Sequence, residues 1–311
     1  MKPSEMPQSV SPEQRYHPSP ARGLILMSIG IMLMPLTDGV AKFLSATIPP
    51  GEVAWGRFLF QALLTTPIVI ALTGWRSLIP KQIWANALRG VLMAGGTTLF
   101  FIGLTRIPLA DSVAIFFIQP FVLTILAVIF ERERVGWRRW LAIAIGFGGA
   151  ILVIRPSFAE FGPYALLPAI SAVSFACFML LNRRLRGTGG VIAMQGFASI
   201  AATVTMTLIL VLGTSIGVES ISFVAPTATE WGIIAGIGAF AALGHSLMVV
   251  AFRYTTPAVL APTQYLQIIS STAFGFFVFG DFPDTGKWAG IAIIIACGIY
   301  IFWRETRRRP R

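Results

Sequence analysis

Long apolar runs, separated by short polar or Pro/Gly-containing connections, dominate the chain from residue 23 to residue 303. A membrane-spanning helix needs about 20 mainly apolar residues. Because the runs are continuously apolar and do not alternate with polar residues, we do not expect membrane-spanning strands. The pattern predicts ten spanning helices, near residues 23–45, 52–73, 84–105, 109–130, 137–154, 163–182, 190–212, 230–251, 257–279 and 286–303.

Composition narrows the class further. Hydrophobic residues make up 55% of the chain and charged residues 12%, whereas a soluble domain has roughly 25% charged residues. A soluble enzyme, a disordered scaffold and a secreted disulfide domain are therefore excluded, and a polytopic membrane protein remains. Cys177 and Cys297 lie inside apolar runs, where they are expected to be small packing residues.

The basic residues predict the orientation in the membrane. Counted over alternate connections and both termini, 18 Lys and Arg fall on one side, and Arg106, Arg155 and Lys287 fall on the other. The positive-inside rule then places both termini in the cytoplasm. Residues 1–22, rich in Pro and Ser, are expected to be a disordered cytoplasmic tail, and residues 305–311 a basic one. Because the net charge of +11 comes from scattered short loops, nucleic-acid binding is not expected.

The chain repeats itself. In each half a proline opens an apolar run, a central glutamine follows, and a short acidic turn ends it. The matching features are Pro108 and Pro257, Gln119 and Gln267, and the turns 131–133 and 281–284. We predict two five-helix repeats, 23–155 and 163–304, of opposite topology because five is odd. Inverted repeats are typical of secondary transporters, with the substrate near the midplane between the halves.

Several stretches of the sequence resemble one family of transporters. They are Asp38-Gly-Val-Ala-Lys42, Arg57-Phe58, Leu88-Arg89-Gly90, residues 108–131, Ala261–Gln267 and Gly280–Asp284. Together with the repeat, they are similar to the ten-helix EamA-type proteins of the drug/metabolite transporter superfamily. The resemblance implies an all-α integral membrane protein of the bacterial inner membrane that carries a small metabolite by alternating access. It implies no catalytic residue, cofactor or metal.

The cargo stays open between alternatives. The sequence resembles two bacterial subgroups, the riboflavin importers and the S-adenosylmethionine carriers, and the stretch Trp55–Phe58 favours riboflavin-like import. Amino-acid, amine and drug exporters of the same superfamily are further alternatives. A sulfonium cargo would need a carboxylate that no other charge compensates, and the partner of Asp38 decides whether one exists.

Charged residues inside spans are candidates for function because they are costly in a bilayer. Asp38 and Lys42 are four residues apart and share a helix face. Asp38, Lys42, Arg57 and Asp111 are expected at a similar outer level, where one network could hold the helices in register or act as a gate. Arg89, near the cytoplasmic side, is expected to extend to the headgroups, with an inner-gate role as the alternative.

Polar amides and aromatic rings are the candidate substrate contacts. Gln119, Gln264 and Gln267 are expected near the midplane, where an amide offers a neutral cargo both a donor and an acceptor. Pro120 and Pro262 remove backbone donors nearby, and the freed carbonyls could face a cavity. The stacking candidates are Tyr265, Trp55, Phe100 and Phe101, although aromatic residues in spans mostly serve packing.

Other activities lack their sequence signals. There is no Walker A motif, which argues against ATP hydrolysis by this chain. With only His17 and His245 and one deep carboxylate, neither a zinc protease nor an aspartyl dyad can be assembled, so an enzyme is not expected. A channel is disfavoured because no filter-like loop is present. The glycine patterns fit helix packing, rocking of the halves or a homodimer.

Overall fold

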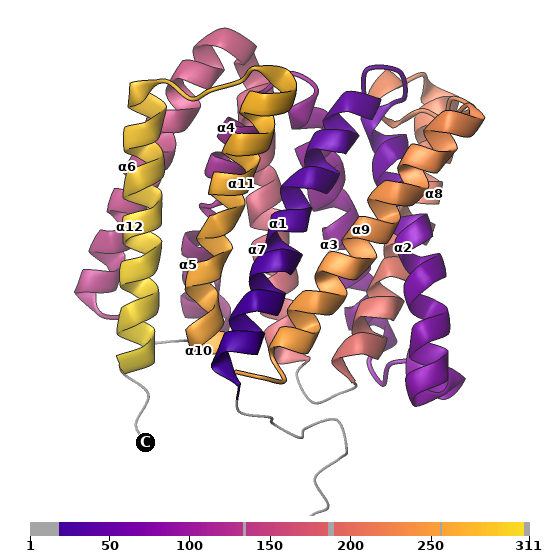
Figure 1. The fold of residues 1–311 in the computed structure, drawn as a ribbon, viewed down its shortest axis with the longest axis horizontal. Helices are drawn as coiled ribbons and strands as arrows, with labels where there is room; N and C mark the ends of the chain where they lie inside the picture. The colour runs from indigo at the N-terminus through magenta and orange to yellow at the C-terminus, as the bar shows by residue number, and fades with distance from the viewer. Residues whose placement is uncertain (1–18, 133–134, 186–189, 256, 308–311) are drawn as a thin grey trace, which may run out of the picture.

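The structure is a computed structural model that describes residues 19–132, 135–185, 190–255 and 257–307. Within these residues the fold is all helical, which confirms the predicted class. The helices run side by side in one elongated bundle, with α6 and α12 at one end of its long axis and α2 and α8 at the other (Figure 1). The longer helices are α1 (Pro20–Leu44), α2 (Pro50–Thr73), α3 (Ile83–Leu104), α6 (Trp137–Phe161), α7 (Leu167–Arg184), α8 (Val191–Ile216), α9 (Ala228–Ala251) and α12 (Thr285–Arg307).

Two of the predicted spans are broken. Residues 109–131 form α4 (Leu109–Phe116) and α5 (Gln119–Glu131), and residues 257–279 form α10 (Pro257–Leu260), the 3-10 turn η5 (Ala261–Tyr265), α11 (Leu266–Phe274) and the π turn η6 (Gly275–Phe279). Pro120 explains the first break, because it has no N–H for the carbonyl of Phe116. Pro262 lies in the second. The prolines that suggested freed carbonyls therefore coincide with interrupted helices.

Seven helical stretches of the described chain are long and apolar enough to cross a membrane, and α12 adds a shorter one, Thr285–Ile301. One of the seven, Trp137–Arg184, joins two predicted spans. Gly162 separates them, because its φ of 61° ends α6 in a backbone conformation that favours glycine. The interrupted stretch 257–279 is not among the seven. Helical segments nevertheless lie over all ten predicted ranges.

The most extensive helix packing joins the two predicted halves to each other. Exchanging the halves maps these packing pairs onto one another: α1–α9 onto α3–α7, α2–α9 onto α3–α8, and α1–α11 onto α5–α7, while α2–α8 and α6–α12 map onto themselves. At the last pair the backbones meet closely, since a Cβ on Gly149 would lie 2.9 Å from the carbonyl oxygen of Gly290. The division into inverted repeats stays a prediction that this pairing supports.

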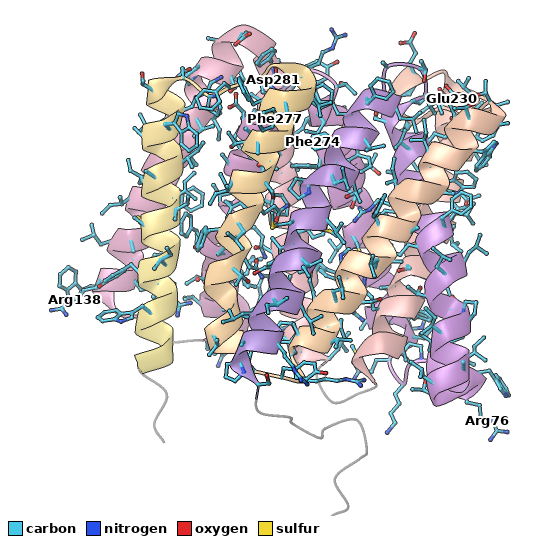
Figure 2. All side chains as sticks on the ribbon, in the orientation of Figure 1. Arg76, Arg138, Glu230, Phe274, Phe277 and Asp281 are labelled. Carbon is cyan, nitrogen blue, oxygen red and sulfur yellow. The ribbon has the colours of Figure 1, made fainter. Side chains whose placement is uncertain are left out.

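Along the direction of the helices, the two ends of the bundle carry different labelled charges. Asp281 and Glu230 lie at one end and Arg76 and Arg138 at the opposite end (Figure 2). We call these the acidic end and the basic end. Helix α1 begins and α12 ends at the basic end (Figure 1). Helix α1 starts at Pro20, a few residues earlier than predicted. The predicted tails lie largely outside the described residues, at 1–18 and 308–311.

Candidate functional site

The two broken helices meet around a cavity of about 280 Å³. Gln119, the first residue of α5, and Gln264 of η5 both line it. The rings of Phe117 and Tyr265 also line it, with centroids 5.5 Å apart and planes 34° apart. The remaining lining residues are Pro120, Leu123, Thr124, Ala127, Arg139, Met179, Arg183, Gly298 and Ile301. We call this space the amide cavity. Arg139 and Arg183 extend it toward the basic end of the bundle, where α6 begins and α7 finishes.

Three of the predicted substrate-contact residues thus come together, and the others do not. Gln267 is half-buried on α11 but is not among the residues that line the amide cavity. Trp55 lines a separate hollow of about 390 Å³ with Phe223 and Thr207, and its Nε1 donates to the Thr207 hydroxyl at 2.9 Å. Trp55 and the amides therefore do not line one shared site in this structure.

Phe100 and Phe101 are buried in the core. Phe100 packs edge-on against Phe116, with ring centroids 5.6 Å apart. Phe101 lies under the guanidinium of Arg57, 6.0 Å from the ring centroid to Cζ. Neither lines the amide cavity, so both rings act in packing here.

Gly298 sets the position of the Tyr265 ring in the amide cavity. A Cβ on Gly298 would overlap the Tyr265 hydroxyl. We expect Gly298→Ala to push the ring aside and to lower transport of the cargo at least about ten-fold, because small misplacements at a site are costly. The measurement is the initial uptake rate, corrected for the amount of inserted protein.

Tyr265→Phe provides the control for this prediction, because it removes the overlapping hydroxyl and keeps the ring. The double variant Gly298→Ala/Tyr265→Phe should recover part of the lost rate, because the ring Cζ would still lie 2.9 Å from the added Cβ. If Gly298→Ala alone transports normally, the position of the Tyr265 ring does not matter for transport.

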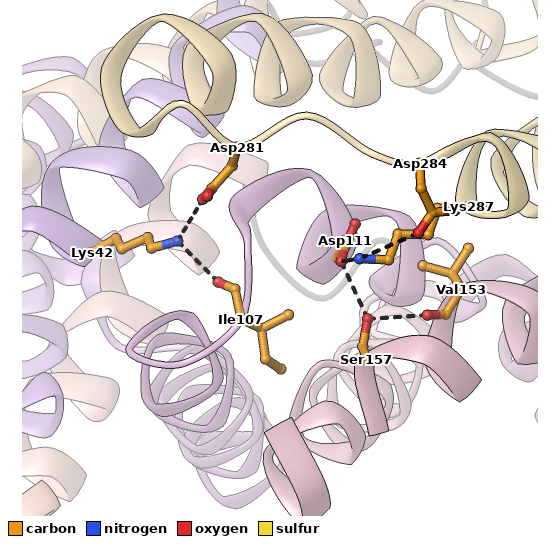
Figure 3. Close-up of polar contacts among 8 residues, drawn as sticks. All are labelled: Lys42, Ile107, Asp111, Val153, Ser157, Asp281, Asp284 and Lys287. Atoms are coloured by element: carbon orange, nitrogen blue, oxygen red, sulfur yellow. Dashed lines mark hydrogen bonds and ion pairs between the residues drawn. The ribbon is translucent and has the colours of Figure 1, made fainter. Parts of the chain in front are cut away.

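The predicted single charge network of Asp38, Lys42, Arg57 and Asp111 is wrong as one unit. Lys42 does not pair with Asp38. Its Nζ donates to Asp281 at 3.1 Å and to the backbone carbonyl of Ile107 at 3.1 Å (Figure 3). Asp281, in the turn after η6, lies over the end of α1, and this partly exposed position desolvates the ammonium less than a deeper one would.

Asp111 belongs to a second ion pair at the acidic end. Lys287 Nζ lies 2.7 Å from Asp111 Oδ2, and the Ser157 hydroxyl donates to the same carboxylate at 3.2 Å (Figure 3). Asp111 and Lys287 side chains are 1% and 10% exposed, so this pair is more deeply buried than Lys42–Asp281. Sequence reasoning counted Lys287 as a loop charge, but it lies in the first turn of α12. Both ion pairs join a residue of the first predicted half to one of the second.

Asp38 and Arg57, the other two residues of the predicted charge network, lie in the interior of the bundle. At 1.5 Å per residue, Asp38, Arg57 and Thr97 lie about 9–11 Å from the ends of α1, α2 and α3 nearest the acidic end. The Asp38 carboxylate and the Arg57 guanidinium lie within electrostatic range of each other. The Arg57 guanidinium also lies within electrostatic range of the His245 imidazole on α9.

Asp38 has no hydrogen bond and no ion pair within 4.0 Å among the described residues. It keeps accessible surface, yet it faces away from lipid. At about 100° per residue it lies on the side of α1 opposite Ile25 and Phe43, which are 59% and 64% exposed. A carboxylate with no committed partner, inside the bundle, can bind a cation or an ammonium group.

Gln61 completes this region, and sequence reasoning missed it. It lies one helical turn from Arg57 on α2, is fully buried, and has no hydrogen-bond partner for either amide atom. The available signal was a single amide in the apolar run from Phe58 to Leu64. We call Asp38, Arg57, Gln61, Thr97 and His245 the interior polar cluster.

Arg89 does not extend to the headgroups, so that expectation is wrong. It is 3% exposed and lies over the Phe178 ring, with 5.4 Å from Cζ to the centroid. Its Nη1 donates to Asn86 Oδ1 at 2.7 Å and to the carbonyl of Met194 at 3.4 Å. These contacts tie α3 to α7 and α8, while the Arg89 Nε stays buried without a hydrogen-bond partner among the described residues.

Comparison with known proteins gives relatives along nearly the whole chain. The chain is 28% identical over 291 residues to the S-adenosylmethionine uptake transporter of Rickettsia felis, and the alignment covers 92% of this chain and 96% of the relative. It is 27% identical to the riboflavin transporter of Brucella anthropi, covering 83% and 90%. It is 25% identical to the pseudopaline exporter of Pseudomonas aeruginosa, covering 88% and 94%.

Structure and family comparisons agree with these relatives. A solved crystal structure aligns with a TM-score of 0.62 over 94% of this chain and all of that one, at 17% identity, which supports the fold alone. Residues 21–155 match the model of the EamA-like transporter family. The helical membrane fold and three transporter relatives that align with at least 83% of the chain support an EamA-type transporter of the drug/metabolite transporter superfamily.

Proposed function

We propose that this transporter carries a small zwitterionic metabolite of the S-adenosylmethionine class across the bacterial inner membrane by alternating access. The observation that carries the proposal is Asp38, a carboxylate inside the bundle that no described residue pairs with. A sulfonium or ammonium cargo needs such a group. Lys42, the expected competitor, is engaged by Asp281, and Arg57, although within electrostatic range of Asp38, forms no ion pair with it. The S-adenosylmethionine uptake relatives add support.

The arrangement of gates supports alternating access. At the acidic end, Lys42–Asp281 and Asp111–Lys287 each connect the two predicted halves. At the other end the amide cavity reaches Arg139 and Arg183. If the basic end is cytoplasmic, as the positive-inside rule predicts, ion pairs at the outer side and a cavity that extends toward the inner side are what an inward-facing conformation would have. Opening outward would require both ion pairs to separate.

Riboflavin-like import is the second candidate, and the amide cavity favours it. Gln119 and Gln264 can donate to and accept from a neutral heterocycle, and the Phe117 and Tyr265 rings are near enough to stack on it. The stretch Trp55–Phe58 suggested this cargo from the sequence. Trp55 lies in a different hollow, however, so its contribution to that argument is weaker.

The test is uptake of labelled S-adenosylmethionine and labelled riboflavin into membrane vesicles with and without the protein. We expect saturable entry of S-adenosylmethionine that unlabelled S-adenosylmethionine blocks and riboflavin does not. Saturable riboflavin entry without S-adenosylmethionine entry would reverse the order of the two candidates. Entry of neither by well-inserted protein would reject both cargoes.

Weakening the Lys42–Asp281 ion pair should favour the outward-open state. We expect Lys42→Gln to speed labelling of a buried reporter, Ser112→Cys, by a membrane-impermeant maleimide added outside. The increase should be up to about five-fold, because a partly exposed ion pair contributes roughly 0–1 kcal/mol. Labelling is followed in a background in which Cys177 and Cys297 are replaced by serine.

Glu160→Gln is the control for this prediction. Glu160 is an exposed carboxylate near the end of α6, at the acidic end of the bundle. It should leave labelling of the reporter unchanged. Equal labelling in Lys42→Gln and the parent would mean that Lys42–Asp281 does not hold the outer side closed.

A further inference from the structure

The buried amide of Gln61 is unusual in energetic terms. Its side chain has no exposed surface, and neither Nε2 nor Oε1 has a hydrogen-bond partner in the described part of the chain. Buried polar groups are nearly always paired, because leaving water without a new partner is unfavourable. A leucine of similar size would suit this conformation better. An unpaired amide in a moving protein therefore suggests a partner that is present in another state.

Arg57 has unused capacity at the same place. Its guanidinium offers five N–H donors, but within the described residues it makes one hydrogen bond, from Nη1 to the Thr97 hydroxyl at 3.2 Å. Its Nε is buried without a partner. The rings of Phe58 and Phe101 lie 5.3 and 6.0 Å from Cζ. These rings flank the guanidinium without using its in-plane donors, which keeps its fork free for a planar anion.

A purely structural Asp38–Arg57 ion pair would account for the charges less well. Their side chains are not within 4.0 Å of each other as an ion pair, although each is in the other's electrostatic range. A structural pair would use the bidentate geometry that Arg and carboxylates favour. Because of this separation, neither charged group is taken up by an ion pair with the other.

We propose that Arg57 and Gln61, with Thr97 beside them, bind the carboxylate of the cargo, while Asp38 binds its cationic group. The inference rests on the proposed function and deepens it: the cargo would be recognised by an α-amino-acid moiety. Arg57 and Gln61 are four residues apart on one face of α2, so one carboxylate can accept from both. In the structure described here the Gln61 amide is covered, so the site forms when the helices around α2 separate.

The test uses pairs of ligands that differ only in the carboxylate. Binding to purified protein in nanodiscs is measured for S-adenosylmethionine and decarboxylated S-adenosylmethionine, and for methionine and 3-(methylthio)propylamine. We expect the carboxylate forms to bind at least about ten-fold more tightly, as the loss of hydrogen bonds to a charged group implies. Gln61→Leu should reduce that ratio several-fold, and Gln61→Glu should reverse it by repulsion.

Stability measurements separate this role from a packing role. Because Gln61→Leu removes two unpaired polar atoms, its unfolding temperature should be unchanged or higher. Gln195→Leu, a glutamine on α8 outside the interior polar cluster, is the matched control and should leave the ligand ratio unchanged. A lower unfolding temperature for Gln61→Leu with an unchanged ratio would overturn the inference.

The failures of the two proposals can be distinguished. If S-adenosylmethionine and its decarboxylated form bind equally well to the parent protein, the carboxylate site is rejected and the proposed cargo class survives. If the parent protein binds no member of either ligand pair, both proposals are rejected.

Discussion

Asp38→Asn should abolish transport of a cationic or zwitterionic cargo, with a loss of about 100-fold in initial uptake rate. A charge-assisted hydrogen bond contributes roughly 1.5–3 kcal/mol, which corresponds to about 10–100-fold in binding. The substitution keeps the shape of the side chain, and among the described residues Asp38 has no hydrogen bond to lose. Uptake of labelled S-adenosylmethionine per inserted protein measures the effect.

Two variants separate loss of charge from loss of fold. Asp38→Asn leaves Arg57 without its neighbouring carboxylate, so the unfolding temperature must be measured beside transport. Asp38→Glu keeps the charge and should retain part of the activity. Glu160→Gln changes an exposed carboxylate near the end of α6 at the acidic end and should have little effect. Normal transport by Asp38→Asn would remove Asp38 from the mechanism.

Lys287→Met should be the most destabilising change among the charged residues at the acidic end. It would leave the Asp111 carboxylate, 1% exposed, with only the Ser157 hydroxyl as a partner in the described part of the chain. Removing one partner of a buried ion pair costs about 3–5 kcal/mol. We expect the unfolding midpoint in detergent to fall by on the order of 10 °C.

The comparison pair for Lys287→Met is already in the protein. Lys42–Asp281 has side chains 17% and 29% exposed, so Lys42→Met should lower the midpoint far less. The double variant Asp111→Asn/Lys287→Met should regain most of the lost stability, because no buried charge is left unpaired. Equal losses for Lys42→Met and Lys287→Met would contradict this ranking of the two ion pairs.

Local features of the chain were predictable because their causes are local. Continuous apolar runs predict membrane helices, and Pro120 interrupts one of them through its missing N–H, whatever the rest of the fold does. Gln119 and Gln264, which line the amide cavity, lie beside these breaks, whereas Gln267, the counterpart of Gln119 in the predicted repeat, does not line it.

Partner choice was not predictable, because it depends on distant residues. The spacing of Asp38 and Lys42 allows them to pair, but it does not exclude a better partner 239 residues away, and Lys42 takes Asp281. Lys287 lies in a segment that reads as a loop charge, yet packing places it against Asp111. The sequence contains Gln61 but does not indicate that both of its amide atoms are unpaired.

Exchange in proteoliposomes tests the central claim most directly. Purified protein is reconstituted into vesicles loaded with unlabelled S-adenosylmethionine, and entry of external labelled S-adenosylmethionine is followed. The account predicts rapid entry that internal S-adenosylmethionine accelerates and that Asp38→Asn removes. Absence of such exchange by well-folded, reconstituted protein would contradict carriage of an S-adenosylmethionine-like cargo through the Asp38 site.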